Sequence, residues 1–263
     1  MSDPTAERKP GAEDPESEQE SGKMSFLDHL DELRKRLVHV AIYLGVGFIV
    51  SWFFARRIYD FLAVPITQSL PEGTKLAYTN PTDPFTLYMK VALLAGIFLT
   101  LPLTLYEVWK FIAPGLYRKE KSYVLPFLFF SILLFLSGAS FCYLVVLPTA
   151  FDFLVNLGAS FTPMIRINEY LDFTNMMLLG FGLIFEMPVL AAFLSMFGLV
   201  SARFLWKKFN YAMVAIVALA AIISPTGDAL NLFWWSAPMV VLYLISIGVA
   251  ALFGWRRRRK GLV

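Results

Sequence analysis

The sequence predicts an all-α integral membrane protein in which six transmembrane helices form a cup-like bundle. Hydrophobic residues make up 57% of the 263 residues and the mean hydropathy is +0.61, far outside the range of soluble domains. Six apolar runs of about 20 residues, the thickness of a hydrocarbon core, follow one another along the chain. Lysine and arginine are unequally shared between the segments that join these runs. A soluble enzyme is excluded, and we expect no enzyme activity.

The N-terminal segment differs in composition from the rest of the chain. Residues 1–22 hold seven acidic residues against two basic ones and show no apolar periodicity. We therefore expect a disordered acidic tail over 1–22, which is too polar for a secretory signal peptide. The six-helix transmembrane domain then covers 23–255, and residues 256–263 form a basic cytoplasmic tail.

The predicted spans lie at roughly 37–55, 88–109, 122–147, 171–199, 207–223 and 232–252. The fifth span ends at the helix-breaking run 224–227, and the sixth contains Pro238. We expect these two to cross a thinned bilayer or to pack against longer neighbours.

The distribution of lysine and arginine predicts the orientation of the spans. If the N-terminus is cytoplasmic, 18 basic residues fall on the cytoplasmic side and five on the other. By the positive-inside rule both termini are then cytoplasmic. The run Arg256–Lys260 follows the last span directly, which favours contact with anionic lipid over binding of nucleic acid.

Two longer segments, about 56–87 and 148–170, join spans on the external side. Both are rich in proline, and their apolar spacing predicts short interfacial helices at Ile58–Val64 and Thr149–Leu157. We expect these segments to form a cap over the cup.

A first candidate for chemistry precedes the first span. Ser25 and Asp28 have the spacing of a capping box, which predicts a helix that begins there, lies at the membrane surface and runs into the first span. Two interpretations of its acids stay open. Asp31 and Glu32 pair with basic residues four positions later, among them Arg36, or one acid is a ligand for an incoming cation.

A second candidate is the loop after the second span. Pro114 and the following glycine must break the helix, which makes an apolar rim of Phe111 and Leu116. Glu120 then falls at the start of the third span, where the helix dipole alone already favours an acid.

Glu186 is the third candidate, because it lies alone in an apolar run from Phe173 to Ala202. A charged group at membrane depth costs a few kcal/mol, so such acids usually have a function. Glu186 is either held neutral by a hydrogen bond to a neighbouring helix or faces a concavity that admits water or a partner's polar group. One cysteine, Cys142, and two histidines provide no metal site, and no cofactor is expected.

At these residues the chain resembles TatC, the multispanning receptor of the twin-arginine protein translocase. The resemblance covers about 24–252 and rests on three motifs in order: FLDHLDELRKR at 26–36, FIAPGLY with Glu120-Lys121 at 111–121, and GLIFEMP at 182–188. It implies that Glu32 and Glu120 line the cytoplasmic site that reads the paired arginines of a signal peptide. It also implies that Arg34 belongs to this surface and that Glu186 is the polar residue of the fourth span.

The resemblance has further implications. Pro65 and Asp228 match external-loop positions, although Leu232 stands where the family tends toward glutamine. The implied partners are twin-arginine precursor proteins, the single-span proteins TatA and TatB, and further copies of this chain. The implied function is export of folded proteins across the cytoplasmic (inner) membrane, driven by the proton motive force.

Two other functions fit the sequence less well. A proton-coupled small-molecule transporter would use Glu186 as proton carrier, but the sequence shows no internal repeat and no second intramembrane charge to pair with Glu186. An intramembrane hydrolase would need a membrane-embedded histidine or a Gly-x-Ser-x-Gly elbow, and the sequence has neither.

Overall fold

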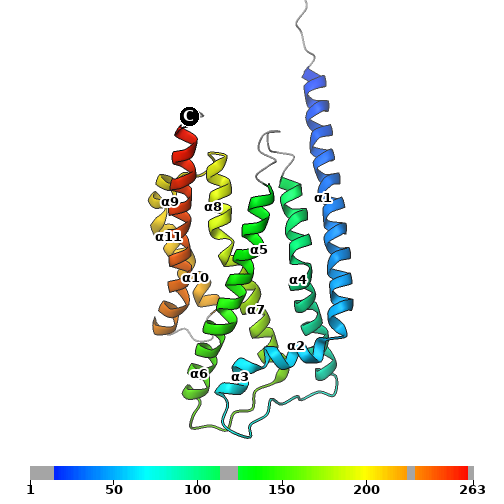
Figure 1. The fold of residues 1–263 in the computed structure, drawn as a ribbon, viewed down its shortest axis with the longest axis vertical. Helices are drawn as coiled ribbons and strands as arrows, with labels where there is room; N and C mark the ends of the chain where they lie inside the picture. Colours follow the sequence, from blue (N-terminus) through cyan, green and yellow to red (C-terminus); the bar gives the residue numbers. More distant parts are fainter. Residues whose placement is uncertain (1–14, 113–123, 224–228, 260–263) are drawn as a thin grey trace, which may run out of the picture.

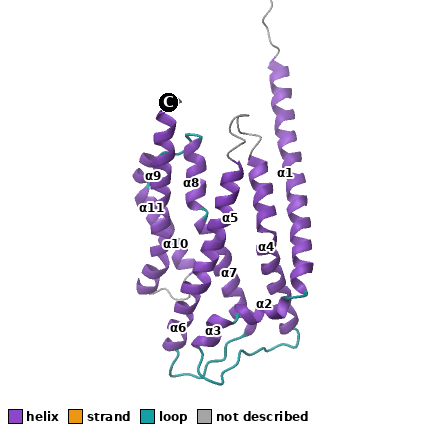
Figure 2. Cartoon of the chain, in the orientation of Figure 1, coloured by secondary structure: helices purple, strands orange, loops and turns teal. Residues whose placement is uncertain are grey.

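The computed structural model describes residues 15–112, 124–223 and 229–259. These residues form helices joined by short segments, with no strand among them (Figure 2). The elements are α1 (Pro15–Trp52), α2 (Ala55–Leu62), α3 (Val64–Ser69), α4 (Asp83–Ile112), α5 (Val124–Phe141), the π-helix η3 (Cys142–Val146), α6 (Leu147–Leu157), α7 (Ile167–Phe185), α8 (Met187–Met196), α9 (Ala202–Lys207), α10 (Phe209–Ile223) and α11 (Ala229–Arg259).

The described helices account for the predicted spans in order. Four stretches are long and apolar enough to cross a bilayer by themselves: α4, α5 to α6, α7 to α8, and α11. The part of α1 from His29 passes the same test together with α2 and α3, from which it is bent by 84°. The shorter α10 begins at Phe209, two residues after the predicted start of the fifth span, and is helical as far as Ile223, where this described range ends. The prediction of an all-α, multi-pass membrane protein is confirmed.

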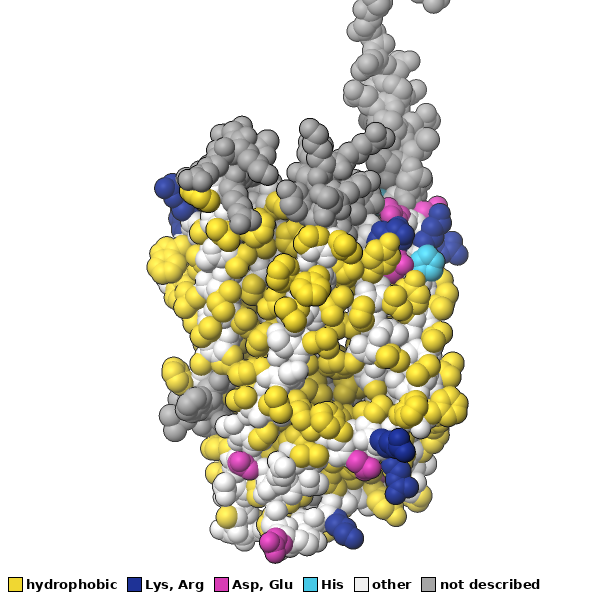
Figure 3. All heavy atoms as spheres, in the orientation of Figure 1, with side chains coloured by type: hydrophobic (Ala, Val, Ile, Leu, Met, Phe, Trp, Pro, Cys, Tyr) yellow, Lys and Arg dark blue, Asp and Glu magenta, His cyan; other side chains and the backbone are white. Residues whose placement is uncertain are grey.

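The start of α1 and the end of α11 lie at the same end of the bundle, here called the terminal end (Figure 1). The opposite end is closed by the cap, which consists of α2, α3 and the segments 70–82 and 158–166. Between the ends, the face in Figure 3 is covered mainly by apolar side chains, and charged side chains gather toward both ends. On α1, for example, Leu37, Val46 and Ile49 are exposed, as expected of a surface that faces lipid.

The cap is held together by backbone hydrogen bonds between its two segments and by two tyrosines. Ala77 exchanges backbone hydrogen bonds of 2.9 Å with Ile165 and Ile167. The hydroxyl of Tyr143 in η3 donates to the carbonyl of Phe61 at 2.7 Å, and Tyr170 in α7 donates to the carbonyl of Leu62. The last carbonyls of α2 are therefore paired, although the helix ends near apolar side chains.

Close helix crossings depend on glycine. A Cβ added at Gly47 in α1 would lie 2.8 Å from the carbonyl oxygen of Gly96 in α4, which is too close for a real contact. The crossing of α5 and α7 is similar, because a Cβ at Gly138 would lie 2.6 Å from the carbonyl oxygen of Phe181. Small residues let transmembrane helices approach at backbone distance and gain packing energy where lipid offers no hydrophobic drive.

The structure corrects several predicted boundaries. α1 begins at Pro15 and passes through Ser25 without a break, so the predicted capping box does not start a helix, and the predicted surface helix is the continuation of the first span. Glutamate, glutamine and lysine at 16–23 are good helix formers and extend an existing helix at little cost. The interfacial helix predicted at Ile58–Val64 is two helices, α2 and α3. The one predicted at Thr149–Leu157 is α6, which is continuous with α5 through η3.

The predicted domain boundaries at 22 and 255 fall inside helices. Residues 15–22 belong to α1, and the backbone of α11 stays helical as far as Arg259. Residues 1–14 and 260–263 lie outside the described residues, so the character of the two tails stays a prediction.

Candidate functional site

Three charged side chains meet at the terminal end, where α1 and α4 run antiparallel (Figure 1). Arg36 donates through Nη2 to Oε1 of Glu32 at 3.0 Å and through Nη1 to Oε2 of Glu107 at 2.9 Å. The two acids therefore bind different nitrogens of one guanidinium. Glu32 and Arg36 are one helical turn apart on α1, and Glu107 comes from α4. We call these three residues the Glu32–Arg36–Glu107 cluster.

The members of the cluster differ in exposure. The side chain of Glu107 is 4% exposed, that of Arg36 18% and that of Glu32 28%. Glu107 has two further neighbours, since the hydroxyl of Tyr43 lies 3.4 Å and Nδ1 of His39 3.6 Å from its Oε1. A buried carboxylate that loses its cation costs about 3–5 kcal/mol, so Arg36 is firmly held by Glu107. Its contact with Glu32 is the solvent-accessible one.

Phe111 lies one turn further along α4 and stacks on His29 of α1, with ring centroids 4.6 Å apart. His29 precedes Glu32 by three positions, so the cluster and the stacked rings are successive contacts along one helix pair. Of the residues predicted for the site, the structure thus brings Glu32 and Phe111 to one surface. Arg34 is exposed on α1. Pro114, Leu116 and Glu120 lie outside the described residues.

Glu186 lies at a break in the fourth span, between α7 and α8. Pro188 has no backbone N–H to continue the hydrogen-bond ladder across this point, which explains the break. Glu186 is only 9% exposed; its carboxyl interacts with Ser131 of α5, while its Oε1 has no hydrogen-bond partner among the described residues. Ser131 in turn accepts a hydrogen bond of 3.2 Å from the indole of Trp109 in α4. The acid is therefore partly satisfied by a neighbouring helix and keeps one buried oxygen free for a partner.

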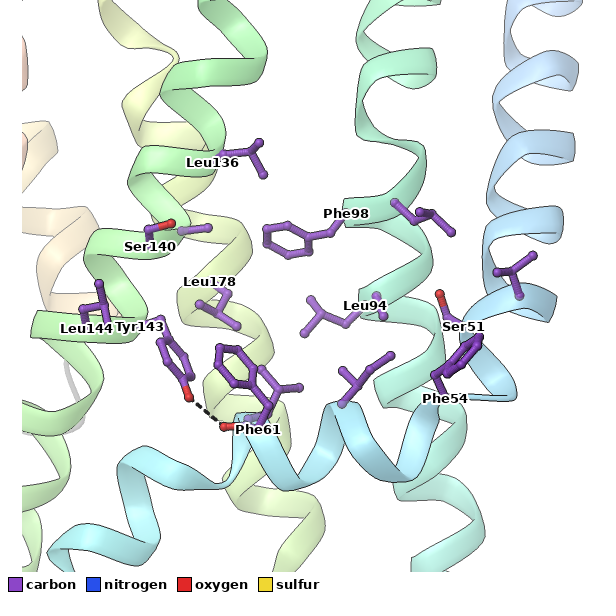
Figure 4. Close-up of a pocket in the computed structure, with 16 residues that line it drawn as sticks. Ser51, Phe54, Phe61, Leu94, Phe98, Leu136, Ser140, Tyr143, Leu144 and Leu178 are labelled. Atoms are coloured by element: carbon purple, nitrogen blue, oxygen red, sulfur yellow. Dashed lines mark hydrogen bonds between the residues drawn. The ribbon is translucent and has the colours of Figure 1, made fainter.

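An apolar pocket of about 820 Å³ opens between the helices on the inner side of α2 (Figure 4). It is lined by α1, α2, α4, α5 and α7, with Phe61, Leu94, Phe98 and Leu178 among its walls. This hollow gives the bundle a concave side. Glu186 does not line it. Pro65, the predicted cap residue, is buried at the second position of α3, where proline is well tolerated, and Asp228 lies outside the described residues.

Comparison with known proteins identifies the family. The family model described as "Sec-independent protein translocase protein (TatC)" matches residues 28–238. The chain belongs to the TatC family. It is 48% identical over 240 residues to a TatC protein of Koribacter versatilis, covering 90% of this chain and 89% of that one. It is 39% identical over 229 residues to TatCy of Bacillus subtilis, covering 86% and 88%.

A crystal structure of a TatC described as a twin-arginine translocase receptor has the same fold. It superposes with a TM-score of 0.76 at 36% identity and covers 86% of this chain and 99% of that one. The resemblance inferred from three sequence motifs is confirmed, and the small-molecule transporter is not favoured.

Sequence reasoning missed the TatC residue that the structure makes most prominent, Glu107. Glu107 lies inside the second predicted span, 88–109, in which it is the only acid, so the expectation of no second charge within the spans was wrong. The argument applied to Glu186, that an acid inside an apolar run needs a reason, would have found it as well. Its pairing with Arg36 depends on how α1 and α4 pack against each other, and that packing cannot be read from a single TatC sequence.

Proposed function

We propose that this chain is the twin-arginine signal peptide receptor of a Sec-independent translocase, which exports folded proteins across the cytoplasmic membrane with the proton motive force. One observation supports this function above the others: Glu32, at the terminal end, already binds a guanidinium, that of Arg36, through its partly exposed carboxylate. The surface is thus chemically suited to arginine. The excess of basic residues at this end supports a cytoplasmic position for it and for both termini.

The chemistry of arginine explains why two acids suit this task. A guanidinium is permanently charged, and its planar fork binds a carboxylate through two parallel hydrogen bonds, which an ammonium cannot do. Two consecutive arginines on an extended peptide therefore require acids on separate elements. We propose Glu32 and Glu120 as these acids, with Arg34, Phe111, Pro114 and Leu116 on the surrounding surface.

We further propose partners within the membrane. The free oxygen of Glu186 at a helix break suits a polar group on a single-span partner such as TatA or TatB. Pro65 and Asp228 belong to the external face, and the basic run Arg256–Lys260, which begins within the last turn of α11, contacts anionic lipid. Further copies of the chain complete the receptor complex.

Peptide binding tests the proposal. The full chain in lipid nanodiscs binds a fluorescent signal peptide with paired arginines, and the Glu32→Gln or Glu120→Gln variant lowers affinity about tenfold, the value of one charge-assisted hydrogen bond. A paired-lysine peptide binds the wild-type chain weakly. Glu169→Gln is the matched control, because Glu169 is in an exposed ion pair with Arg166 near the cap. Equal affinity of the wild-type chain for both peptides contradicts the proposed function.

A further inference from the structure

We propose that Glu107 acts as a fixed counter-charge that neutralises Arg36 and so keeps Glu32 available for a signal arginine. This inference rests on the proposed function and assigns a positioning role to a residue that lies beneath the recognition surface. It follows from the contacts, the burial and the charges of the Glu32–Arg36–Glu107 cluster.

Arg36 is a cation beside the carboxylate that has to attract another cation. Its Nη2 lies 3.0 Å from Oε1 of Glu32. Taken as a pair, Glu32 and Arg36 have no net charge, and an arriving guanidinium would meet no attraction from them beyond short range. Arg34 and Lys35, exposed on the same helix, add two positive charges nearby, against one negative charge from the exposed Asp31. Without a further acid, this surface is a poor site for arginine.

Glu107 provides that acid from the neighbouring helix. Its Oε2 accepts from Nη1 of Arg36 at 2.9 Å, so it leaves the nitrogen that binds Glu32, Nη2, unoccupied by Glu107. With it the cluster has one net negative charge. Among the residues that the structure describes, the other groups that face Glu107 are the hydroxyl of Tyr43 and the half-exposed ring of His39. Neither of them is a permanently charged cation like Arg36.

The burial of Glu107 keeps Arg36 paired with it. With 4% of its side chain exposed, Glu107 depends on Arg36 for its partner, whereas Glu32 remains hydrated in part. When a signal arginine arrives, Arg36 stays with Glu107 and the contact with Glu32 is the one that can be shared or exchanged. A carboxylate has about four acceptor positions and Arg36 uses one of those on Glu32, so a second guanidinium finds room there.

The geometry also fixes where Glu32 stands. Arg36 is anchored in α4 through Glu107, and the stacked rings of His29 and Phe111 hold α1 against α4 three residues before Glu32. Glu32 lies between these two contacts. The stretch of α1 that carries this carboxylate is thus fixed against α4 on both sides. Because it is already ordered, less conformational entropy is lost when a peptide binds.

Charge-neutral variants test the inference. Glu107→Gln keeps the shape and an acceptor for Arg36 but removes the charge, so the affinity of the full chain in nanodiscs for the paired-arginine peptide falls about tenfold at low salt and less at high salt. The double variant Arg36→Gln/Glu107→Gln removes both charges of the buried pair and restores the affinity to within about threefold of wild type, because the net charge of the cluster is again that of Glu32.

The rescue separates charge from structure. A double variant that binds as weakly as Glu107→Gln, or a Glu107→Gln variant that binds like wild type, overturns the inference. Arg36→Gln alone leaves a buried carboxylate unpaired, so its thermal stability is measured beside that of the double variant. Failure of the proposed function has a different signature, since the wild-type chain would then not distinguish paired arginines from paired lysines.

Discussion

The surroundings of the Glu186 side chain are set by a break in the helix backbone. The span breaks at this residue because Pro188 lies two positions later, and the carboxyl lies beside Ser131 with one buried oxygen that has no partner among the described residues. A buried oxygen without a hydrogen-bond partner destabilises the folded chain unless another group binds it. Glu107, the buried acid at the terminal end, differs from Glu186 because it is paired with Arg36.

We expect Glu186→Ala to reduce transport and co-purification of single-span partners several-fold, because the polar group that a partner would bind is lost. Binding of the signal peptide to the purified chain should change by less than about twofold, since Glu186 does not contact the Glu32–Arg36–Glu107 cluster in the structure. Transport of a twin-arginine precursor into membrane vesicles and peptide binding in nanodiscs measure the two effects. A similar loss in both assays would place Glu186 in the recognition site instead.

At the scale of elements, α1 depends on α4 for its position. The two helices meet where Gly47 and Gly96 allow backbone contact, and the ion pair between Arg36 and Glu107 lies nearer the terminal end. The crossing and the ion pair together set the alignment of the two helices.

Two alanine variants of α1 test the crossing. Gly47→Ala would bring its Cβ to 2.6 Å from Thr100 and 2.8 Å from the Gly96 carbonyl, so we expect a loss of about 1–3 kcal/mol in stability. Gly45→Ala is the matched control, because a Cβ there meets nothing within 4 Å, and alanine favours the helix by up to about 1 kcal/mol. Unfolding of the detergent-solubilised chain compares them. Equal stability of the two variants would contradict a close crossing.

The elements were predictable to different degrees. The start of α10 at Phe209 lies within two residues of the predicted start of the fifth span, because Lys207 and Lys208 limit the apolar run locally. The predicted start of the first helix was ten residues too late. A capping pattern shows that a helix can begin at that point, but it does not require an earlier helix to end there. The contact between Arg36 and Glu107 was not predictable, because 71 positions separate them and only the packing of the helices brings them together.

At the scale of the whole molecule, the two ends are chemically distinct. The start of α1 and the end of α11 share one end, which carries the cluster, while the cap closes the other with paired backbone segments and two tyrosine hydroxyls (Figure 1). The apolar surface between the two ends places one end on each side of a bilayer. The distribution of basic residues predicts which end is cytoplasmic.

Labelling with cysteine tests that orientation. Cys142 is buried, so a Cys142→Ala chain is a suitable background for single cysteines at exposed positions. We expect an impermeant maleimide to label Glu169→Cys, near the cap, in intact cells, and Lys35→Cys, at the terminal end, only after the membrane is opened. Inverted vesicles should give the reverse pattern. Labelling of Lys35→Cys in intact cells would show that the orientation is the opposite one.

The antiparallel pairing of α1 and α4 has a consequence for biogenesis. These two long helices come first along the chain, and every residue of the Glu32–Arg36–Glu107 cluster, as well as both glycines of the crossing, lies within the first 112 residues. A nascent chain that has delivered only this hairpin to the membrane already contains every residue that the ion pair and the crossing require. Pairing of Glu107 with Arg36 therefore needs no side chain from a helix that is synthesised later.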